Sequence, residues 1–157
     1  MNSKPRGDTS WAPEGVVQPS PDEWRLVLSH RVAEGAAVTD LITRYTECGI
    51  SPDQVGQVLV DGGDALYAAA VSGEPDWADR FGGPLGVALL AAEVSALASH
   101  LNTRAAGVRS VAVEALLEDY SAITVAAEIG VSRQKIYDIA RSGLRGPHLR
   151  RIPWSRS

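Results

Sequence analysis

Residues 122–141 constrain the fold of this chain more than any other stretch, because a glycine there separates two segments that each predict a short helix. The segments cover residues 122–129 and 133–141. Gly130 can adopt the positive φ angle that ends a helix abruptly, and the hydroxyl of Ser132 can cap the second helix. Ala126 is small enough for the two helices to approach closely. Apolar side chains occupy the positions that a shared core needs: Val125, Ile129, Val131, Ile136 and Ile139.

These residues resemble the helix-turn-helix of bacterial DNA-binding regulators and site-specific recombinases. That family has a small residue, a glycine four positions on, and a branched apolar residue six positions after the glycine. Here those residues are Ala126, Gly130 and Ile136. With residues 108–120 as a supporting first helix, the resemblance covers about residues 108–142. It implies a three-helix DNA-binding unit and does not identify a subfamily.

The second helix of this unit has a polar face suited to DNA. With successive residues about 100° apart, Arg133, Gln134, Tyr137 and Arg141 lie on one side, roughly opposite Ile136. Arginine and glutamine can hydrogen-bond base edges in the major groove, which admits a helix. We therefore expect base contacts from Arg133, Gln134 and Tyr137. Phosphate contacts are expected from Ser132, Lys135, Arg141, Arg145, Arg150 and Arg151. The alternative is an ordinary helical hairpin with a solvated polar face.

Basic residues concentrate at the end of the chain. Residues 133–157 contain seven basic residues and one acid, whereas residues 1–132 contain eight basic residues and eighteen acids. Surface charges attract phosphate only within a Debye length of about 10 Å, so the net charge of −4 is a poor guide to DNA binding. The basic end of the chain supports the DNA interpretation.

The last residues, 144–157, form a basic tail. Gly143 ends the preceding helix, and Gly146-Pro147 discourages another. Such a tail can follow the phosphate backbone or enter a minor groove, where arginine is favoured in narrow A·T-rich stretches. Alternatively, Leu149, Ile152 and Trp154 fold back on the protein. The two interpretations are compatible.

The remainder of the chain predicts more helices, and the fold class is therefore all-α. Residues 1–20 are polar and proline-rich and indicate a flexible arm. A helical region follows at 21–103, and the DNA-binding unit occupies 104–143. Capping boxes at Ser20 and Ser51 begin two of the helices. The expected helices cover residues 21–34, 36–48, 52–61, 65–71, 84–100 and 108–120, with a short one around 77–81.

Two features of the helical region invite functional interpretations. Residues 41–58 look like a second helix-turn-helix, but Tyr45 stands where a small residue is needed, so we expect a structural hairpin. Asp61 and Asp64 flank two glycines, and we expect capping rather than metal binding. In residues 84–101, apolar residues repeat at helical spacing (Val87, Leu90, Val94, Leu97 and Leu101), which indicates a core helix or a dimer seam, with a core helix favoured.

No motif supports catalysis. The three histidines are far apart in sequence, and no nucleophile elbow, phosphate-binding glycine loop or metal-ligand spacing is present. We expect no enzyme activity, no cofactor and no metal. One cysteine, the absence of a signal-peptide pattern and the short apolar runs indicate a cytoplasmic protein without a membrane span.

The expected function is sequence-specific binding of double-stranded DNA by a bacterial transcriptional regulator. A homodimer on a palindrome, with half-sites about 34 Å apart, is the expected form. The alternatives are a mobile-element accessory protein for plasmid maintenance, partition or recombination, and a helical adaptor that binds protein instead of DNA. The sequence identifies no small-molecule effector.

Overall fold

The computed structural model describes residues 17–31 and 34–152, and the predicted arm therefore lies largely outside the described residues. Within these ranges the chain contains α-helices and short 3-10 helices and no strand, which confirms the all-α prediction. The α-helices are α1 (Pro21–Val27), α2 (Ala36–Glu47), α3 (Pro52–Val60), α4 (Asp64–Ala70), α5 (Gly83–Asp119), α6 (Ala122–Ile129) and α7 (Arg133–Ser142), and the 3-10 helices are η1 (Ser29–Arg31) and η2 (Asp79–Phe81).

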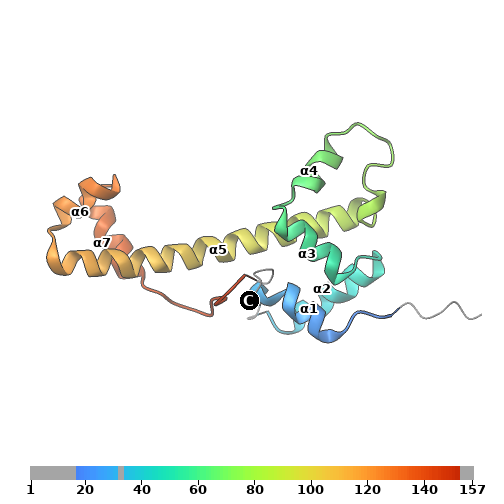
Figure 1. The fold of residues 1–157 in the computed structure, drawn as a ribbon, viewed down its shortest axis with the longest axis horizontal. Coiled ribbons are helices and arrows are strands. Elements are labelled where there is room, and N and C mark those ends of the chain that lie inside the picture. The colour runs from blue at the N-terminus through green and yellow to red at the C-terminus, as the bar shows by residue number, and fades with distance from the viewer. Residues whose placement is uncertain (1–16, 32–33, 153–157) are drawn as a thin grey trace, which may run out of the picture.

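Helix α5 is the axis of the molecule, with α1–α4 at one end and α6 and α7 at the other (Figure 1). Its 37 residues give a length of about 55 Å. The prediction of separate helices at 84–100 and 108–120 is wrong. The residues between them include good helix formers, and Gly107 is buried where Leu144 packs against the helix, so nothing there ends the helix.

The two ends of α5 bury opposite faces. Leu90 and Glu93 face the N-terminal body, whereas Ser110 and Val113 face α6 and α7. Ser110 follows Leu90 by twenty positions, and Val113 follows Glu93 by the same number. At about 100° per residue, the second pair is rotated about 200° around the helix axis from the first. The helix is therefore apolar on two faces because it serves two separate cores.

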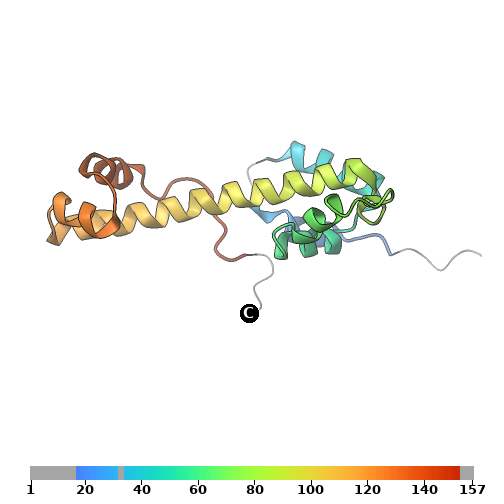
Figure 2. The ribbon, with the colours of Figure 1, turned by 90° about the horizontal axis from the view of Figure 1, so that it is seen from above.

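The N-terminal body packs α1, α2 and α3 against the first half of α5. Trp24 of α1 stacks on Tyr45 of α2 with ring centroids 5.7 Å apart, and both rings are buried. Leu90 and Leu97 of α5 lie in this core, and Val87, Val94 and Leu101 pack against it. The apolar repeat of residues 84–101 is thus a core face, as favoured. Figure 2 shows the body wrapped around one end of α5.

Local capping signals define the starts of α1 and α3. The Ser20 hydroxyl accepts from Glu23 N and the Ser51 hydroxyl from Gln54 N, and both predicted capping boxes are present. Helix α1 nevertheless ends at Val27 rather than 34. The 3-10 turn that follows it carries His30 and Arg31, which both reach the carboxylate of Glu93.

The loop between α3 and α4 confirms the capping role of one acid. Asp61 accepts hydrogen bonds from Gly63 N at 2.8 Å and Ala65 N at 3.2 Å. Its carboxylate therefore supports the turn into α4. No group of side chains with metal-ligand geometry is found among the described residues.

The C-terminal unit consists of the end of α5 with α6 and α7. Gly130 has φ 79°, and the Ser132 hydroxyl accepts from Lys135 N at 3.2 Å, so the predicted turn and cap are both present. Val113, Val125, Ile136 and Ile139 form a core that is separate from that of the N-terminal body.

Helix α5 is also long and apolar enough to cross a membrane by length and composition. The sequence prediction considered only the longest uninterrupted apolar run, residues 84–92, which ends at Glu93 and is too short to cross a membrane. Glu93, within the apolar half of this helix, is buried and pairs with Arg31 and His30.

Candidate nucleic-acid interface

The predicted contact residues of α7 lie on its solvent-facing side. Ile136 and Ile139 are buried in the C-terminal core and hold the helix against α5 and α6. The residues assigned to bases and phosphates on and beside the helix are all exposed: Ser132, Arg133, Gln134, Lys135, Tyr137 and Arg141. The fold therefore presents them together on one short, rigid element.

Three of these side chains are already oriented by neighbours within α7. The Arg133 guanidinium lies 5.8 Å from the centroid of the Tyr137 ring, a cation–π distance. Arg141 forms an ion pair with Asp138, and Gln134 Nε2 donates to the same carboxylate at 3.5 Å. Asp138 thus holds two of the predicted contact residues, a role that its sequence position alone did not indicate.

The beginning of α7 offers donors for an anion. Its first backbone N–H groups have no partner within the helix, and only one of them is capped by Ser132. Because the Ser132 hydroxyl oxygen accepts from Lys135 N, its hydrogen is free to donate to a phosphate. Lys135 is exposed one turn away. This arrangement suits the phosphate role assigned to both residues.

A shallow pocket lies beside Arg133 and Tyr137. It is lined from α5 and α6 by Leu117, Tyr120, Ser121, Ala122 and Ile123. Tyr120 and Ile123 are exposed, and both adjoin the predicted base-contacting side chains. Sequence reasoning did not assign them a role, because only the packing of α6 against α7 brings them there.

A buried hydroxyl fixes the end of α7 on α5. Ser110 is fully buried, donates to Ala140 O at 3.1 Å and accepts from Gly143 N at 2.7 Å. It satisfies two backbone groups at a helix end that would otherwise lack partners. Next to it, a Cβ atom on Gly107 would lie 2.6 Å from Leu144 Cδ1. Both residues position α7, and sequence reasoning missed both.

The basic tail returns along α5 towards the N-terminal body (Figures 1 and 2). Leu149 N donates to His100 Nε2 at 3.3 Å, and Arg104 donates to Arg150 O at 3.4 Å. Burial and the neighbouring His148 lower the pKa of His100, which keeps it neutral as an acceptor. Of the two interpretations of the tail, folding back applies to the described part, while Trp154 and Arg156 lie outside it.

The predicted phosphate contacts therefore fall into two groups. Ser132, Lys135 and Arg141 lie on or beside α7, and Arg145 follows it closely, with its guanidinium 3.4 Å from Arg141 O. Arg150 and Arg151 are exposed beside α5, in the part of the tail that has turned away from α7. The structure brings the first group together and separates the second group from it.

The described residues also contain a buried charged cluster, which centres on Glu93 of α5. His30 Nε2 lies 2.5 Å from Glu93 Oε1, Arg31 Nε donates to the same atom at 2.7 Å, and Tyr45 donates to Oε2 at 2.9 Å. Burial alone would raise the pKa of Glu93, but the hydrogen bonds and the charge of Arg31 outweigh it and lower the pKa.

The cluster is closed to solvent at its centre. The side chains of Glu93 and His30 have no solvent exposure, so a substrate has no access to them. Burial and the charge of Glu93 raise the pKa of Tyr45, which keeps its phenol protonated as a donor. Sequence reasoning treated the histidines as isolated because His30 and Glu93 are far apart in the chain.

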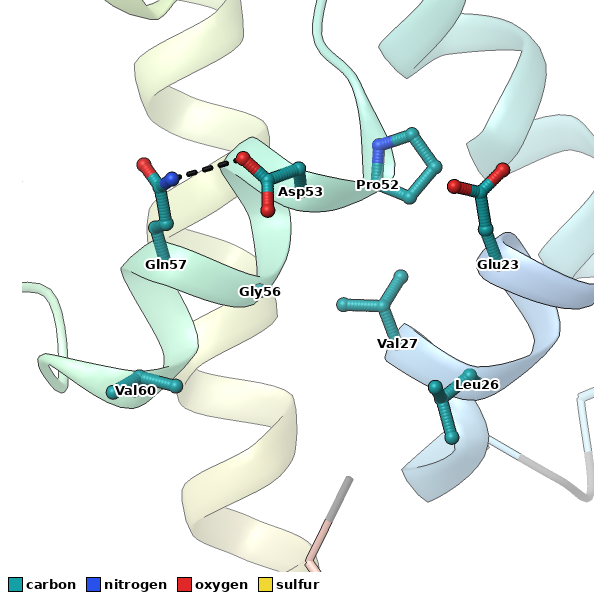
Figure 3. Close-up of a pocket in the computed structure, with 8 residues that line it drawn as sticks. All are labelled: Glu23, Leu26, Val27, Pro52, Asp53, Gly56, Gln57 and Val60. Carbon is teal, nitrogen blue, oxygen red and sulfur yellow. Dashed lines mark hydrogen bonds between the residues drawn. The ribbon is translucent and has the colours of Figure 1, made fainter. Parts of the chain in front are cut away.

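A groove between α1 and α3 is the other candidate binding site (Figure 3). Its volume is about 470 Å³, and it is widely open to solvent. Val27, Gly56 and Pro52 form its floor, and Glu23 and Asp53 lie on its rim. Asp53 is held by Gln57 at 2.9 Å. The groove has no set of convergent buried polar groups, which a small-molecule site needs for orientation.

Comparison of the chain with protein-family models, with curated proteins and with solved structures finds no match.

Proposed function

We propose that this chain binds double-stranded DNA sequence-specifically through α7, as a homodimeric bacterial transcriptional regulator. The observation that carries the proposal is the exposed polar face of α7 on a buried apolar anchor. Arg133, Gln134 and Tyr137 project from the side opposite Ile136, so a groove-bound helix can reach base edges with them.

The roles within the interface follow from chemistry and position. Arg133 addresses guanine, which offers two acceptors to one guanidinium, and Gln134 addresses adenine. Ser132, Lys135, Arg141 and Arg145 hold phosphates around the helix. Asp138 keeps Arg141 and Gln134 oriented in the free protein and releases them on DNA. No step of this function requires a catalytic group, a cofactor or a metal.

The charge distribution supports the same orientation on DNA. Six of the seven basic residues from 133 onwards are described, and each is exposed. The N-terminal body carries most of the acids and therefore faces away from the phosphates. Cytoplasmic location follows from the proposal, and the free thiol of Cys48 suits that reducing compartment.

A mobile-element accessory protein uses the same interface, and only the location of its sites differs. Binding sites clustered at an origin or at a recombination site would identify that role. A helical adaptor is favoured by one observation, the open groove between α1 and α3 with Leu26 and Val60 exposed at 60% and 58%. An adaptor lacks salt-sensitive affinity for DNA.

Selection from genomic fragments tests the proposal. The full chain is incubated with fragmented genomic DNA, and the bound fragments are sequenced and titrated against random duplex. We expect a few fragments to bind at least ~10³-fold more tightly than random DNA. The double variant Arg133→Ala/Gln134→Ala should lose this preference, whereas Arg25→Ala, on α1, should retain it. Equal binding of all fragments by the wild type would contradict sequence-specific recognition.

A further inference from the structure

The second half of α5 has an exposed apolar seam on the side opposite α6 and α7. The seam consists of Ala105, Val108, Ala112 and Ala115, whose spacings of three, four and three match the a and d positions of a coiled coil. Val108 is 59% exposed, and Val111 beside the seam is 48% exposed. No described residue covers this stripe.

The seam cannot be explained by the fold of one chain. Gly107, Ser110 and Val113, on the other side of the same turns, already contact the tail, α7 and the C-terminal core. Packing within the unit is therefore complete without the seam. An exposed stripe of valine and alanine at coiled-coil spacing fits another helix, because small residues let two backbones approach to about 8 Å.

The charges beside the seam identify the orientation of that other helix. Arg104 lies near its beginning, Arg109 lies in its middle, and Glu118 and Asp119 lie near its end. None of these four residues forms an ion pair within the described residues, although Arg104 donates one N–H to the backbone carbonyl of Arg150 in the tail. The two acids also stand in the last turn of α5, where the helix dipole disfavours negative charge. A partner that places basic side chains beside the end of α5 stabilises Glu118 and Asp119.

We propose that the seam binds the same seam of a second copy, with the two α5 helices antiparallel. A two-fold axis near residue 110 places Ala105 opposite Ala115 of the other copy and Val108 opposite Ala112. The same axis brings Arg104 of each copy beside Glu118 of the other copy, so the dimer contains two such ion pairs. A parallel pair instead aligns arginines with arginines and acids with acids, which is unfavourable. The antiparallel orientation therefore pairs opposite charges at both ends of the seam, as a two-fold dimer requires, and Arg109 near the axis is the one charge that lies beside its own copy.

This inference deepens the dimer of the proposed function but rests on α5 alone, so it is tested without DNA. The mass of the full chain is measured by sedimentation over a range of concentrations. We expect a dimer for the wild type and at least about tenfold weaker dimerisation for Val108→Asp, because the dimer buries that charge. Leu85→Asp, an exposed position on the same helix but away from the seam, should leave the dimer unchanged.

Charge reversal tests the pairing. Arg104→Glu should weaken the dimer, and adding Glu118→Arg to the same chain should restore it. Circular dichroism of each variant confirms that the helices are intact. Val108 and Glu118 are exposed and Arg104 is half-buried beside the tail, so we expect unchanged spectra. If Val108→Asp does not fold, the charge-reversal pair decides. Failure of the double variant to recover would overturn the proposed pairing.

Disulfide trapping tests the orientation. In a Cys48→Ser background, chains carrying Ala105→Cys are mixed with chains carrying Ala115→Cys. The antiparallel dimer forms the mixed disulfide, whereas a parallel dimer links Ala105→Cys chains to each other. A wild-type monomer at every concentration would overturn the seam, whether or not that monomer binds DNA. A dimer without affinity for DNA would retain the seam and overturn only the proposed function.

Discussion

The two ends of α5 are held together by different interactions. The N-terminal body surrounds a buried carboxylate, Glu93, with His30, Arg31 and Tyr45. The C-terminal unit has an apolar core whose buried polar side chain is a single hydroxyl, that of Ser110. Removing one partner of a buried charge costs more unfolding free energy than removing a hydroxyl that bonds two backbone groups. The two ends should therefore respond differently to mutation and to pH.

The largest effect should come from removing the buried carboxylate. Glu93→Leu leaves Arg31, His30 and Tyr45 without their shared partner and should cost about 3–5 kcal/mol of unfolding free energy. Hydrogen exchange resolved by segment should show the loss in residues 21–60 and little change in 122–142. Glu34→Gln, which removes only the negative charge of the exposed partner of Arg31, should cost less than about 1 kcal/mol. Equal losses at both ends would mean that they fold as one unit.

Low pH should destabilise the N-terminal body, because that body contains Glu93. The pKa of Glu93 in the folded protein is lowered from its ordinary value of 4.5, so the unfolded chain binds the proton more readily. The stabilisation by Glu93 is fully present at pH values above the unfolded-state pKa of 4.5. It is lost as the pH falls through the lower pKa that Glu93 has in the folded protein. Denaturation of the wild type at a series of acidic pH values should show this loss in the N-terminal body. Glu93→Gln should remove this part of the pH dependence; an unchanged profile would contradict the assignment.

The C-terminal unit should respond to loss of its buried hydroxyl. Ser110→Ala leaves the N–H of Gly143 without a partner and should cost about 1–3 kcal/mol. Faster exchange should appear at the end of α7, while residues 21–60 remain protected. Ser95→Ala, an exposed serine of the same helix, is the control and should be nearly neutral. Unaltered exchange at Gly143 would show that the hydroxyl is not needed there.

Base recognition should respond to Arg133. Arg133→Ala should weaken binding to the selected sites by about 1–3 kcal/mol and relax specificity at one base pair. The readout is a titration against every single-base variant of a selected site. An equal loss on all sequences would instead make Arg133 a phosphate contact.

The smallest effect should come from Asp138. Asp138→Asn removes a negative charge from the interface and frees Arg141, so affinity for random duplex should rise by a few-fold, within the range of an exposed ion pair of about 0.2–1 kcal/mol. Preference for the selected sites should fall, because the neutral amide oxygen is a weaker acceptor than the carboxylate and orients Gln134 less firmly. Competition between random duplex and a selected site measures both changes. Reduced affinity for random duplex would contradict this role.

Local signals in the sequence were sufficient for much of the fold. Ser20 with Glu23, Ser51 with Gln54, and Gly130 with Ser132 predicted helix boundaries correctly because caps and glycine turns act within a few residues. The polar face of α7 was predictable for the same reason, since helical periodicity alone determines it.

Long-range features could not be predicted. The pairing of His30 with Glu93 joins residues 63 positions apart, and that of Ser110 with Gly143 joins residues 33 positions apart. Gly107 lies inside α5 with Leu144 packed against it, a contact across 37 positions that no local pattern indicates. The course of the tail along α5 likewise depends on His100, an acceptor that is supplied by a different helix.

The most direct test of the central claim is the salt dependence of DNA affinity in the wild type and in Lys135→Ala/Arg141→Ala. We predict that the affinity of the wild type for duplex DNA falls steeply with salt, with a slope of about −0.9 for each phosphate neutralised. The double variant lacks two of the proposed phosphate contacts, so the magnitude of its slope should be smaller by about 1.8. Arg25→Ala on α1 should not change the slope. Absence of binding even at low salt would contradict the account and favour the adaptor.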